Sequence, residues 1–174
     1  VSIVSKKFKN VEVTAIVTAG VRTNASRAGD EASYWEDNGE FHFGTINIIL
    51  LTNVCLEKST LTEAFMTITE AKTVALSNLK IPSQYSNGFA TGTGTDGVAV
   101  FSNLDSNNVL TNAGKHSKLG ELIAKSVIEA ISKHEDEREA LRILEELGTN
   151  SPSDDVREIV SRFLVRKNTT DFLK

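Results

Sequence analysis

Residues 91–97 read Thr-Gly-Thr-Gly-Thr-Asp-Gly, and residues 98–101, Val-Ala-Val-Phe, follow them directly. Threonine favours extended backbone, and glycine lets that backbone bend or approach another group closely. The apolar run predicts a buried strand. A polar, glycine-containing segment that leads into such a strand suits the floor of a ligand site, and a strand with a bulge is the structural alternative.

Two further segments predict strands of the same sheet. Residues 11–18 are rich in β-branched side chains, and residues 44–53 place Ile46, Ile48 and Leu50 on one face. Asn47 shares the other face with Thr45, and an amide buried there would need hydrogen-bond partners. Together with residues 97–102, these segments predict the central strands of a mixed sheet, and residues 1–4 predict an edge strand.

Two helices are predicted to flank this sheet. The capping box Thr60-x-x-Glu63 starts the first, which ends before Pro82. Ser117 caps the second. The expected core positions are Leu61, Ala64, Phe65, Ile68, Ala71, Ala75 and Leu79 in the first helix, and Leu119, Leu122, Ile123, Val127, Ile128 and Ile131 in the second.

The composition changes after Lys133, where a charged helix over residues 135–147 and a further helix from Ser151 are predicted. The fold class is therefore α/β, with α+β as the alternative. We expect a single domain over residues 1–133, with a mixed central sheet flanked by helices. Residues 134–174 are expected to form a short helical appendage.

The composition bounds the class of protein. The chain has 174 residues, a net charge of −4 and 40% hydrophobic residues, typical of a soluble globular protein rather than a nucleic-acid binder. No apolar run reaches the ~18 residues of a membrane span, and no signal-peptide pattern is visible. The single cysteine, Cys55, excludes an intrachain disulfide, so a reducing cytoplasm is the expected location.

Five polar segments stand out, at residues 22–30, 45–47, 70–72, 91–96 and 115–118. The first follows the end of a predicted strand, where open α/β sheets bind ligands. The last opens a helix, where backbone N–H groups, His116 and two lysines would form an anion- or carbonyl-binding corner. Solvated loops, an exposed Glu70 and a capping cluster are the structural alternatives. A functional role predicts that all five segments converge on one cleft.

Taken in order, the polar segments and the strand at 44–49 resemble the adenosylcobinamide amidohydrolase family. The motifs are Thr18-Ala19-Gly20-Val21 through Asn24 to Arg27-Ala28-Gly29-Asp30; Gly44-Thr45-Ile46-Asn47-Ile48-Ile49; Thr69-Glu70-Ala71-Lys72-Thr73; Ala90-Thr91-Gly92-Thr93-Gly94-Thr95-Asp96; and Gly114-Lys115-His116-Ser117-Lys118-Leu119-Gly120. The resemblance covers roughly residues 11–130, and the helices after residue 133 are extra to it. It implies corrinoid salvage: hydrolysis of the amide that joins aminopropanol to the corrin ring of adenosylcobinamide, giving adenosylcobyric acid.

Amide hydrolysis needs a nucleophile, a base, an acid and stabilisation of the oxyanion. Asp96, Glu70, His116 and Asp30 are the catalytic candidates, and direct attack by water with Asp96 or Glu70 as base is the favoured mechanism. The threonines are nucleophiles only if a base lies beside them. The expected substrate-binding residues are Arg22, Asn24, Arg27, Thr45, Asn47, Lys72, Thr91, Thr93, Thr95, Lys115 and Lys118.

No metal-ligand cluster is visible, because His42, His116 and His134 are scattered along the chain. We therefore expect no metal and no cofactor, with the corrinoid as substrate. The alternatives are a non-catalytic protein that binds a corrinoid or a nucleotide, and a structural subunit whose helical tail forms a homodimer.

Overall fold

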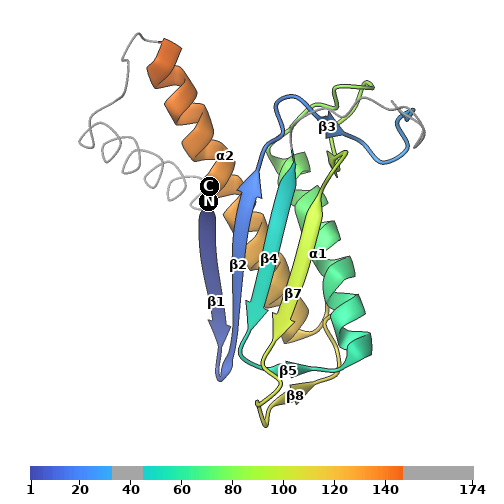
Figure 1. The fold of residues 1–174 in the computed structure, drawn as a ribbon, viewed down its shortest axis with the longest axis vertical. Coiled ribbons are helices and arrows are strands. Elements are labelled where there is room, and N and C mark those ends of the chain that lie inside the picture. The colour runs from blue at the N-terminus through green and yellow to red at the C-terminus, as the bar shows by residue number, and fades with distance from the viewer. Residues whose placement is uncertain (33–44, 147–174) are drawn as a thin grey trace. The chain divides into compact units, whose positions relative to one another are not determined.

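The computed structural model describes residues 1–32 and 45–146 (Figure 1). The contacts divide the chain into two compact units, Val1–Ser132 and Lys133–Lys174. The first unit contains all of the strands, the helix over Lys58–Asn78 and the start of the last helix. The elements are β1 (Ser2–Phe8), β2 (Val11–Ala19), β3 (Ala25–Ser26), β4 (Ile46–Thr52), β5 (Cys55–Leu56), α1 (Lys58–Asn78), β6 (Gly92–Thr93), β7 (Gly97–Ser102), β8 (Val109–Leu110) and α2 (Lys118–Glu146).

The main sheet has four strands in the order β1-β2-β4-β7. β1 and β2 are antiparallel, as are β2 and β4, whereas β4 and β7 are parallel and joined through α1. Two short ladders, β3 with β6 and β5 with β8, pair loops beyond the main sheet. The prediction of one α/β domain with a mixed sheet is confirmed.

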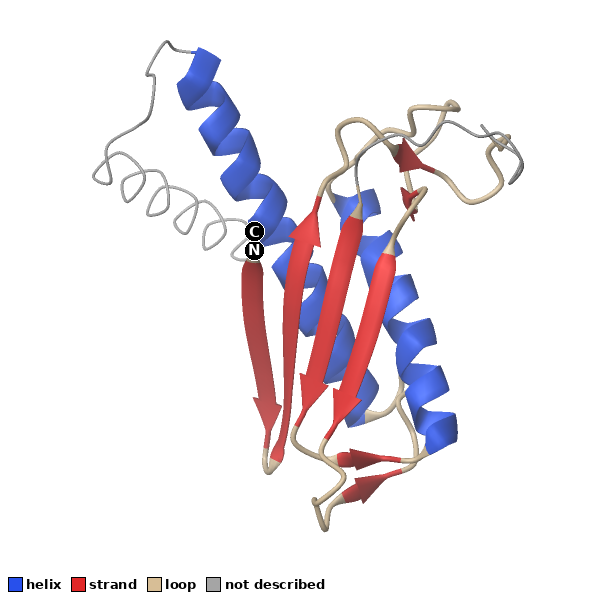
Figure 2. Cartoon of the chain, viewed as in Figure 1, coloured by secondary structure: helices blue, strands red, loops and turns tan. Residues whose placement is uncertain are grey.

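The helices lie behind the sheet, as Figure 2 shows for α1 and the first turns of α2. Burial alternates strictly along β4, where Ile46, Ile48 and Leu50 face the helices and are at most 1% exposed. These side chains pack with Ile68 of α1 and Ile123 of α2 into one core. The strand periodicity predicted from the sequence is therefore confirmed, since alternate residues of a strand point to opposite faces.

The other face of the sheet is not covered by α1 or α2. Asn47 lies on this face and is exposed, so the amide does not need the buried partners that the sequence suggested. Phe101 of β7 is 57% exposed on the same side. β7 is also an edge of the four-stranded sheet rather than a central strand. An apolar pattern along a strand indicates that one of its faces is buried, but it does not indicate whether the strand pairs with one neighbouring strand or two.

α1 begins earlier than the capping box predicted. Glu57 is its N-cap, and Thr60 lies buried within the first turn. The Glu63 carboxylate instead accepts a hydrogen bond from the backbone N–H of Ala113, at 2.9 Å. Phe65, expected in the core, is 41% exposed. The helix ends before Pro82, as expected, and four of the seven predicted core positions are fully buried: Ala64, Ile68, Ala71 and Ala75.

α2 starts as predicted, because the Ser117 hydroxyl accepts a hydrogen bond from the N–H of Gly120 at 2.9 Å. Its apolar face, including Leu119, Val127 and Ile131, is buried. Residues 135–146 are helical, as predicted, but they continue α2 without a break rather than forming a separate helix. Lys, Glu and Ala are good helix formers, and no glycine or proline interrupts residues 121–146. The helix predicted from Ser151 lies outside the described residues.

No helix in the described part of the chain combines the length and apolar character that crossing a membrane requires.

Candidate functional site

Three of the polar segments, at residues 22–30, 45–47 and 91–96, meet at one end of the sheet, the upper end in Figure 1, and Lys72 of a fourth segment reaches this end from α1. Ala19, at the end of β2, pairs with Ile46, at the start of β4, and Asn47 pairs with Gly97, at the start of β7. The short β3–β6 ladder then joins Ala25 to Thr93. The loops that enter and leave these strands are thus drawn together, although the sequence separates them by up to about seventy positions.

The centre of this region is a polar cluster around the Asp96 carboxylate. The Lys72 ammonium, from α1, forms an ion pair with Asp96 Oδ2. The Thr93 hydroxyl donates to Asp96 Oδ1 at 2.6 Å, and the Thr93 backbone N–H lies 3.1 Å from each carboxylate oxygen. The backbone N–H of Ile46 adds a bond of 3.2 Å. We call Lys72, Thr93 and Asp96 the Lys72–Asp96 cluster.

The cluster is largely withdrawn from water. The side chains of Lys72 and Asp96 are only 11% and 13% exposed. A charge in such a place is tolerated when it is paired and when hydrogen bonds satisfy its remaining oxygens. Asp96 meets both conditions. The arrangement holds one carboxylate in a fixed position with a hydroxyl beside it, which is the geometry of a base next to a nucleophile.

The glycines of residues 91–97 make room for the protein's own polar side chains. A Cβ on Gly92 would lie 2.7 Å from Lys72 Nζ and would overlap Asp96 Oδ2. A Cβ on Gly97 would lie 2.8 Å from Asn47 Oδ1, and one on Gly94 would lie 3.2 Å from Asn24 Nδ2. The sequence predicted a close approach to a ligand at these glycines. In the structure they approach side chains that were themselves predicted to bind substrate.

Gly92→Ala should separate Lys72 from Asp96 and destabilise the fold by about 1–3 kcal/mol, the usual cost of overpacking. The measurement is the free energy of unfolding from urea denaturation. Gly94→Ala is the matched control, because its new methyl group would need a neighbour to move by only a few tenths of an ångström. Equal stability of the two variants would show that Gly92 is not required for the ion pair.

Asn24 and Asp30 fasten the neighbouring loops. The Asn24 side-chain oxygen accepts a hydrogen bond from the Tyr85 hydroxyl at 3.1 Å. Asp30 accepts hydrogen bonds from the Ser83 hydroxyl at 2.6 Å, from the Ser86 hydroxyl at 2.5 Å and from the Arg27 N–H at 2.8 Å. The serine bonds, that of Ser83 first, lower the pKa of Asp30 below its ordinary value of 3.8. A carboxylate held ionised in this way is a poor proton acceptor, so its geometry suits a loop anchor.

Tyr85, Ser83 and Ser86 were not among the sequence candidates. They belong to residues 83–88, which the sequence marks only as a turn after Pro82. Hydroxyl side chains in a turn are common, and nothing in their spacing points to Asn24 or Asp30. Their role follows from the fold, because the backbone N–H of Gln84 bonds to the carbonyl of Ala25 at 2.9 Å and so brings the turn beside β3.

Of the remaining candidates near this end of the sheet, two threonines bond to the backbone of neighbouring loops and two arginines are exposed. The Thr45 hydroxyl donates to the Thr95 carbonyl at 2.6 Å, and the Thr91 hydroxyl accepts from the N–H of Ala28 at 2.8 Å. These bonds tie the glycine-containing segment to the loops on either side. Arg22 and Arg27 are exposed, and the Arg27 guanidinium would lie 2.7 Å from a Cβ on Gly88.

Glu70 is not part of the Lys72–Asp96 cluster. It lies two positions from Lys72 on α1, which places it roughly 200° around the helix. Its carboxylate pairs instead with Lys115 Nζ, at 2.8 Å, and about half of its side chain is exposed. His116, the next residue, is also exposed. An exposed ion pair of this kind contributes at most about 1 kcal/mol and does not indicate a reaction centre.

Lys118 lies at the opposite end of the sheet from Asp96. Its ammonium sits 4.8 Å from the ring centre of Phe8, at the end of β1. Phe8 pairs with Val11, at the start of β2, whereas the Asp96 region lies beside Ala19, at the end of β2. The nine residues of β2 span roughly 26 Å at about 3.3 Å per residue. The prediction that all five polar segments share one cleft is therefore wrong for Lys118.

In the described ranges, 1–32 and 45–146, no three His, Cys, Asp or Glu side chains are grouped so that they could hold a metal ion. His42 lies outside these ranges.

Comparison with known proteins identifies the family. A family model for adenosylcobinamide amidohydrolase matches residues 1–142, which include every element of the site described above. An uncharacterized protein of Methanocaldococcus jannaschii is 40% identical over 152 residues, covering 77% of this chain and 59% of that protein. The chain thus spans somewhat more than half the length of this relative. No solved structure matches the chain significantly. With most of its length matched by the family model, the chain belongs to the adenosylcobinamide amidohydrolase family.

Proposed function

We propose that this protein hydrolyses the amide between aminopropanol and the corrin ring of adenosylcobinamide, giving adenosylcobyric acid. Family membership supports the reaction class. The hydrogen bond of 2.6 Å from the Thr93 hydroxyl to Asp96 Oδ1 supports these two residues as the place where the amide is hydrolysed. A hydroxyl and a carboxylate at this distance can exchange a proton, and Lys72 fixes the orientation of that carboxylate.

In the proposed mechanism, Asp96 is the base and the Thr93 hydroxyl is the nucleophile. As Thr93 Oγ1 attacks the amide carbon, its proton passes to Asp96, and the carbonyl π electrons move to oxygen. When the tetrahedral intermediate collapses, the C–N bond breaks and the proton on Asp96 passes to the departing aminopropanol nitrogen. Water then hydrolyses the ester on Thr93, with Asp96 accepting a proton from that water and returning it to Thr93.

The surrounding side chains suit a substrate that carries many amide arms. Asn47 is exposed on the open sheet face, directly beside Gly97. Asn24 lies against Gly94, but it is buried and its side-chain oxygen accepts from the Tyr85 hydroxyl, so it positions the glycine-containing segment. Amide side chains both donate and accept hydrogen bonds, so Asn47 can pair with an amide of the corrinoid. In this proposal Asn47 orients the substrate while Lys72, Thr93 and Asp96 act on the reacting amide.

The experiment is incubation of the protein with adenosylcobinamide, followed by mass spectrometry of the products. The expected result is release of aminopropanol and formation of adenosylcobyric acid in equal amounts. Adenosylcobyric acid added as substrate is the control and should remain unchanged, since it lacks the aminopropanol amide. Failure to form product from adenosylcobinamide that is bound would contradict the proposal.

The alternative is a protein that binds a corrinoid without turnover. One observation favours it: both Asp96 oxygens already accept hydrogen bonds from within the protein, as a purely structural carboxylate would. The same experiment separates the two functions. Saturable binding of adenosylcobinamide, measured by its visible absorption, without any release of aminopropanol would identify the binding protein.

A further inference from the structure

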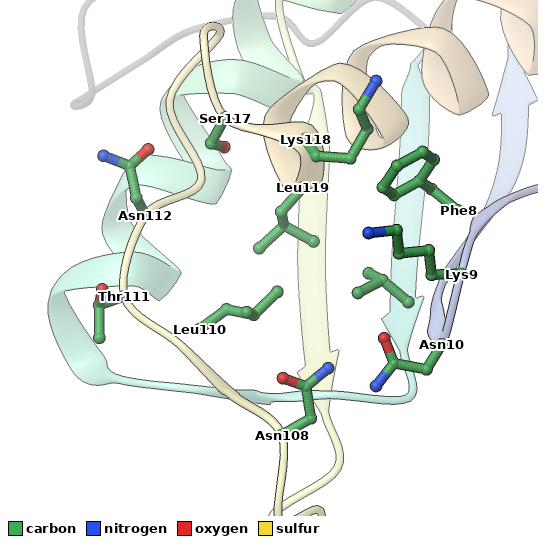
Figure 3. Close-up of a pocket in the computed structure, with 11 residues that line it drawn as sticks. Phe8, Lys9, Asn10, Asn108, Leu110, Thr111, Asn112, Ser117, Lys118 and Leu119 are labelled. Carbon is green, nitrogen blue, oxygen red and sulfur yellow. The ribbon is translucent and has the colours of Figure 1, made fainter.

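A cavity of about 380 Å³ lies at the end of the sheet opposite the Lys72–Asp96 cluster (Figure 3). It is formed by the turn between β1 and β2, by the polar loop around β8 and by the first turn of α2. Its size is at the small end of the range for pockets that hold small organic ligands. Neither the family match nor the proposed reaction assigns a function to it.

The cavity combines an apolar floor with polar groups. Leu110 and Leu119 reach in from one side, and Lys9 and Asn10 point toward the interior from the other (Figure 3). Asn108, on the loop that carries Leu110, reaches in at the lower edge. A few polar groups placed over an apolar surface are typical of sites that fix the orientation of a small molecule. The two amides can donate and accept hydrogen bonds along the edge of a flat ring.

Positive charge gathers at one rim of the cavity. Both Lys9 and Lys118 lie over the ring of Phe8, with their nitrogens 5.5 Å and 4.8 Å from its centre. Lys118 shares the Glu121 carboxylate with Lys125, and Lys9 has no carboxylate partner among the residues that the structure describes. Two ammonium groups therefore share one carboxylate and a third, that of Lys9, lies nearby over Phe8, in a chain whose net charge is −4. An anion at this rim would be attracted by the excess charge.

Lys9 occupies an unusual backbone conformation. Phe8 pairs with Val11, so Lys9 and Asn10 form the two-residue turn between β1 and β2. The φ angle of Lys9 is 53°, in the left-handed region that glycine adopts most readily. Two-residue hairpin turns commonly require a positive φ, so this conformation follows from the turn itself. The turn directs the Lys9 ammonium toward the cavity.

From these observations we propose that the cavity is a second binding site, for a phosphate monoester attached to a flat, hydrogen-bonding ring, with the size of a nucleoside monophosphate. Lys9, whose ammonium points into the cavity, binds the phosphate, and Lys118, paired with Glu121, adds positive charge at the rim. Leu110 and Leu119 contact the ring, and Asn10 and Asn108 bond to its edge. This site is independent of the proposed amide hydrolysis, since roughly the full length of β2 separates it from Asp96.

The test is calorimetric titration of the full chain with AMP, adenosine and inorganic phosphate. We expect saturable binding of AMP, with adenosine and phosphate each at least about tenfold weaker, because each lacks one of the two contacts. Lys118→Gln and Lys9→Gly should each raise the Kd for AMP by about tenfold. The matched control is Lys7→Gln, which removes the same charge from the opposite face of β1.

Lys9→Gly also separates binding from folding. Glycine relieves the left-handed conformation, so this variant should unfold at a temperature roughly 2–4 °C higher while it binds AMP more weakly. The proposal is overturned if AMP does not bind saturably, if adenosine binds as tightly as AMP, or if Lys7→Gln weakens binding as much as Lys118→Gln. Each of these results leaves the amidohydrolase assay unaffected, so the two proposals can fail separately.

Discussion

Asp96→Asn should lower kcat for adenosylcobinamide hydrolysis by about 10²-fold or more and should also destabilise the fold by about 3 kcal/mol. The change is nearly isosteric, but the amide cannot accept all of the hydrogen bonds that the carboxylate accepts. It also leaves the Lys72 ammonium, only 11% exposed on its side chain, without its partner. The expected loss of stability is at the low end for a broken buried ion pair, because both groups retain some contact with water.

Two measurements test this expectation. Urea denaturation gives the change in the free energy of unfolding, and product formation is measured at a temperature where the variant remains folded. The double variant Lys72→Met with Asp96→Asn removes the unpaired charge and should recover part of the stability without recovering activity. Asp105→Asn, an exposed aspartate elsewhere in the same unit, is the control and should change neither quantity. Undiminished activity of Asp96→Asn would show that Asp96 is not the base.

Two of the strands of the main sheet could be predicted from the sequence. Strands over 11–18 and 44–53 could be identified because β-branched residues and strict alternation are local signals. The buried face of β4 followed directly from that alternation. The position of β7 at an edge could not be predicted, since the residues of a strand do not reveal which neighbours it pairs with. The unbroken α2 was missed because a change from apolar to charged composition does not by itself end a helix.

The residues of the candidate site could be predicted from the sequence, but the contacts between them could not. Lys72 and Thr93 were selected from the sequence as substrate-binding residues and Asp96 as a catalytic candidate, yet nothing in it indicates that a lysine and an aspartate 24 positions apart form an ion pair. That pairing depends on α1 running back beside β6 and β7. Lys118 shows the converse case. Its position in a polar segment suggested the same site, but α2 starts at the other end of the sheet.

Thr93→Val should lower kcat by at least about 10²-fold, because it removes the hydroxyl that donates to Asp96 and leaves no nucleophile there. Thr93→Ser should retain activity within about tenfold, since serine supplies the same hydroxyl. Valine preserves the shape of threonine and keeps the backbone N–H bonds to Asp96, so the fold should be maintained. Thr91→Val is the matched control, because the hydroxyl it removes bonds to the backbone of Ala28 instead.

A structural role for Thr93 can be distinguished from a nucleophilic one by the covalent intermediate. In the wild-type protein, acid quenching during turnover should leave the corrinoid acyl group on the peptide that contains Thr93, detected by mass spectrometry. Asp96→Asn should reduce this adduct, because the hydroxyl then lacks the carboxylate that accepts its proton. Full activity of Thr93→Val, with no adduct in the wild type, would establish water as the attacking group. Asp96 would then act on that water directly, in the space beside Gly92 and Lys72 where the hydroxyl now lies.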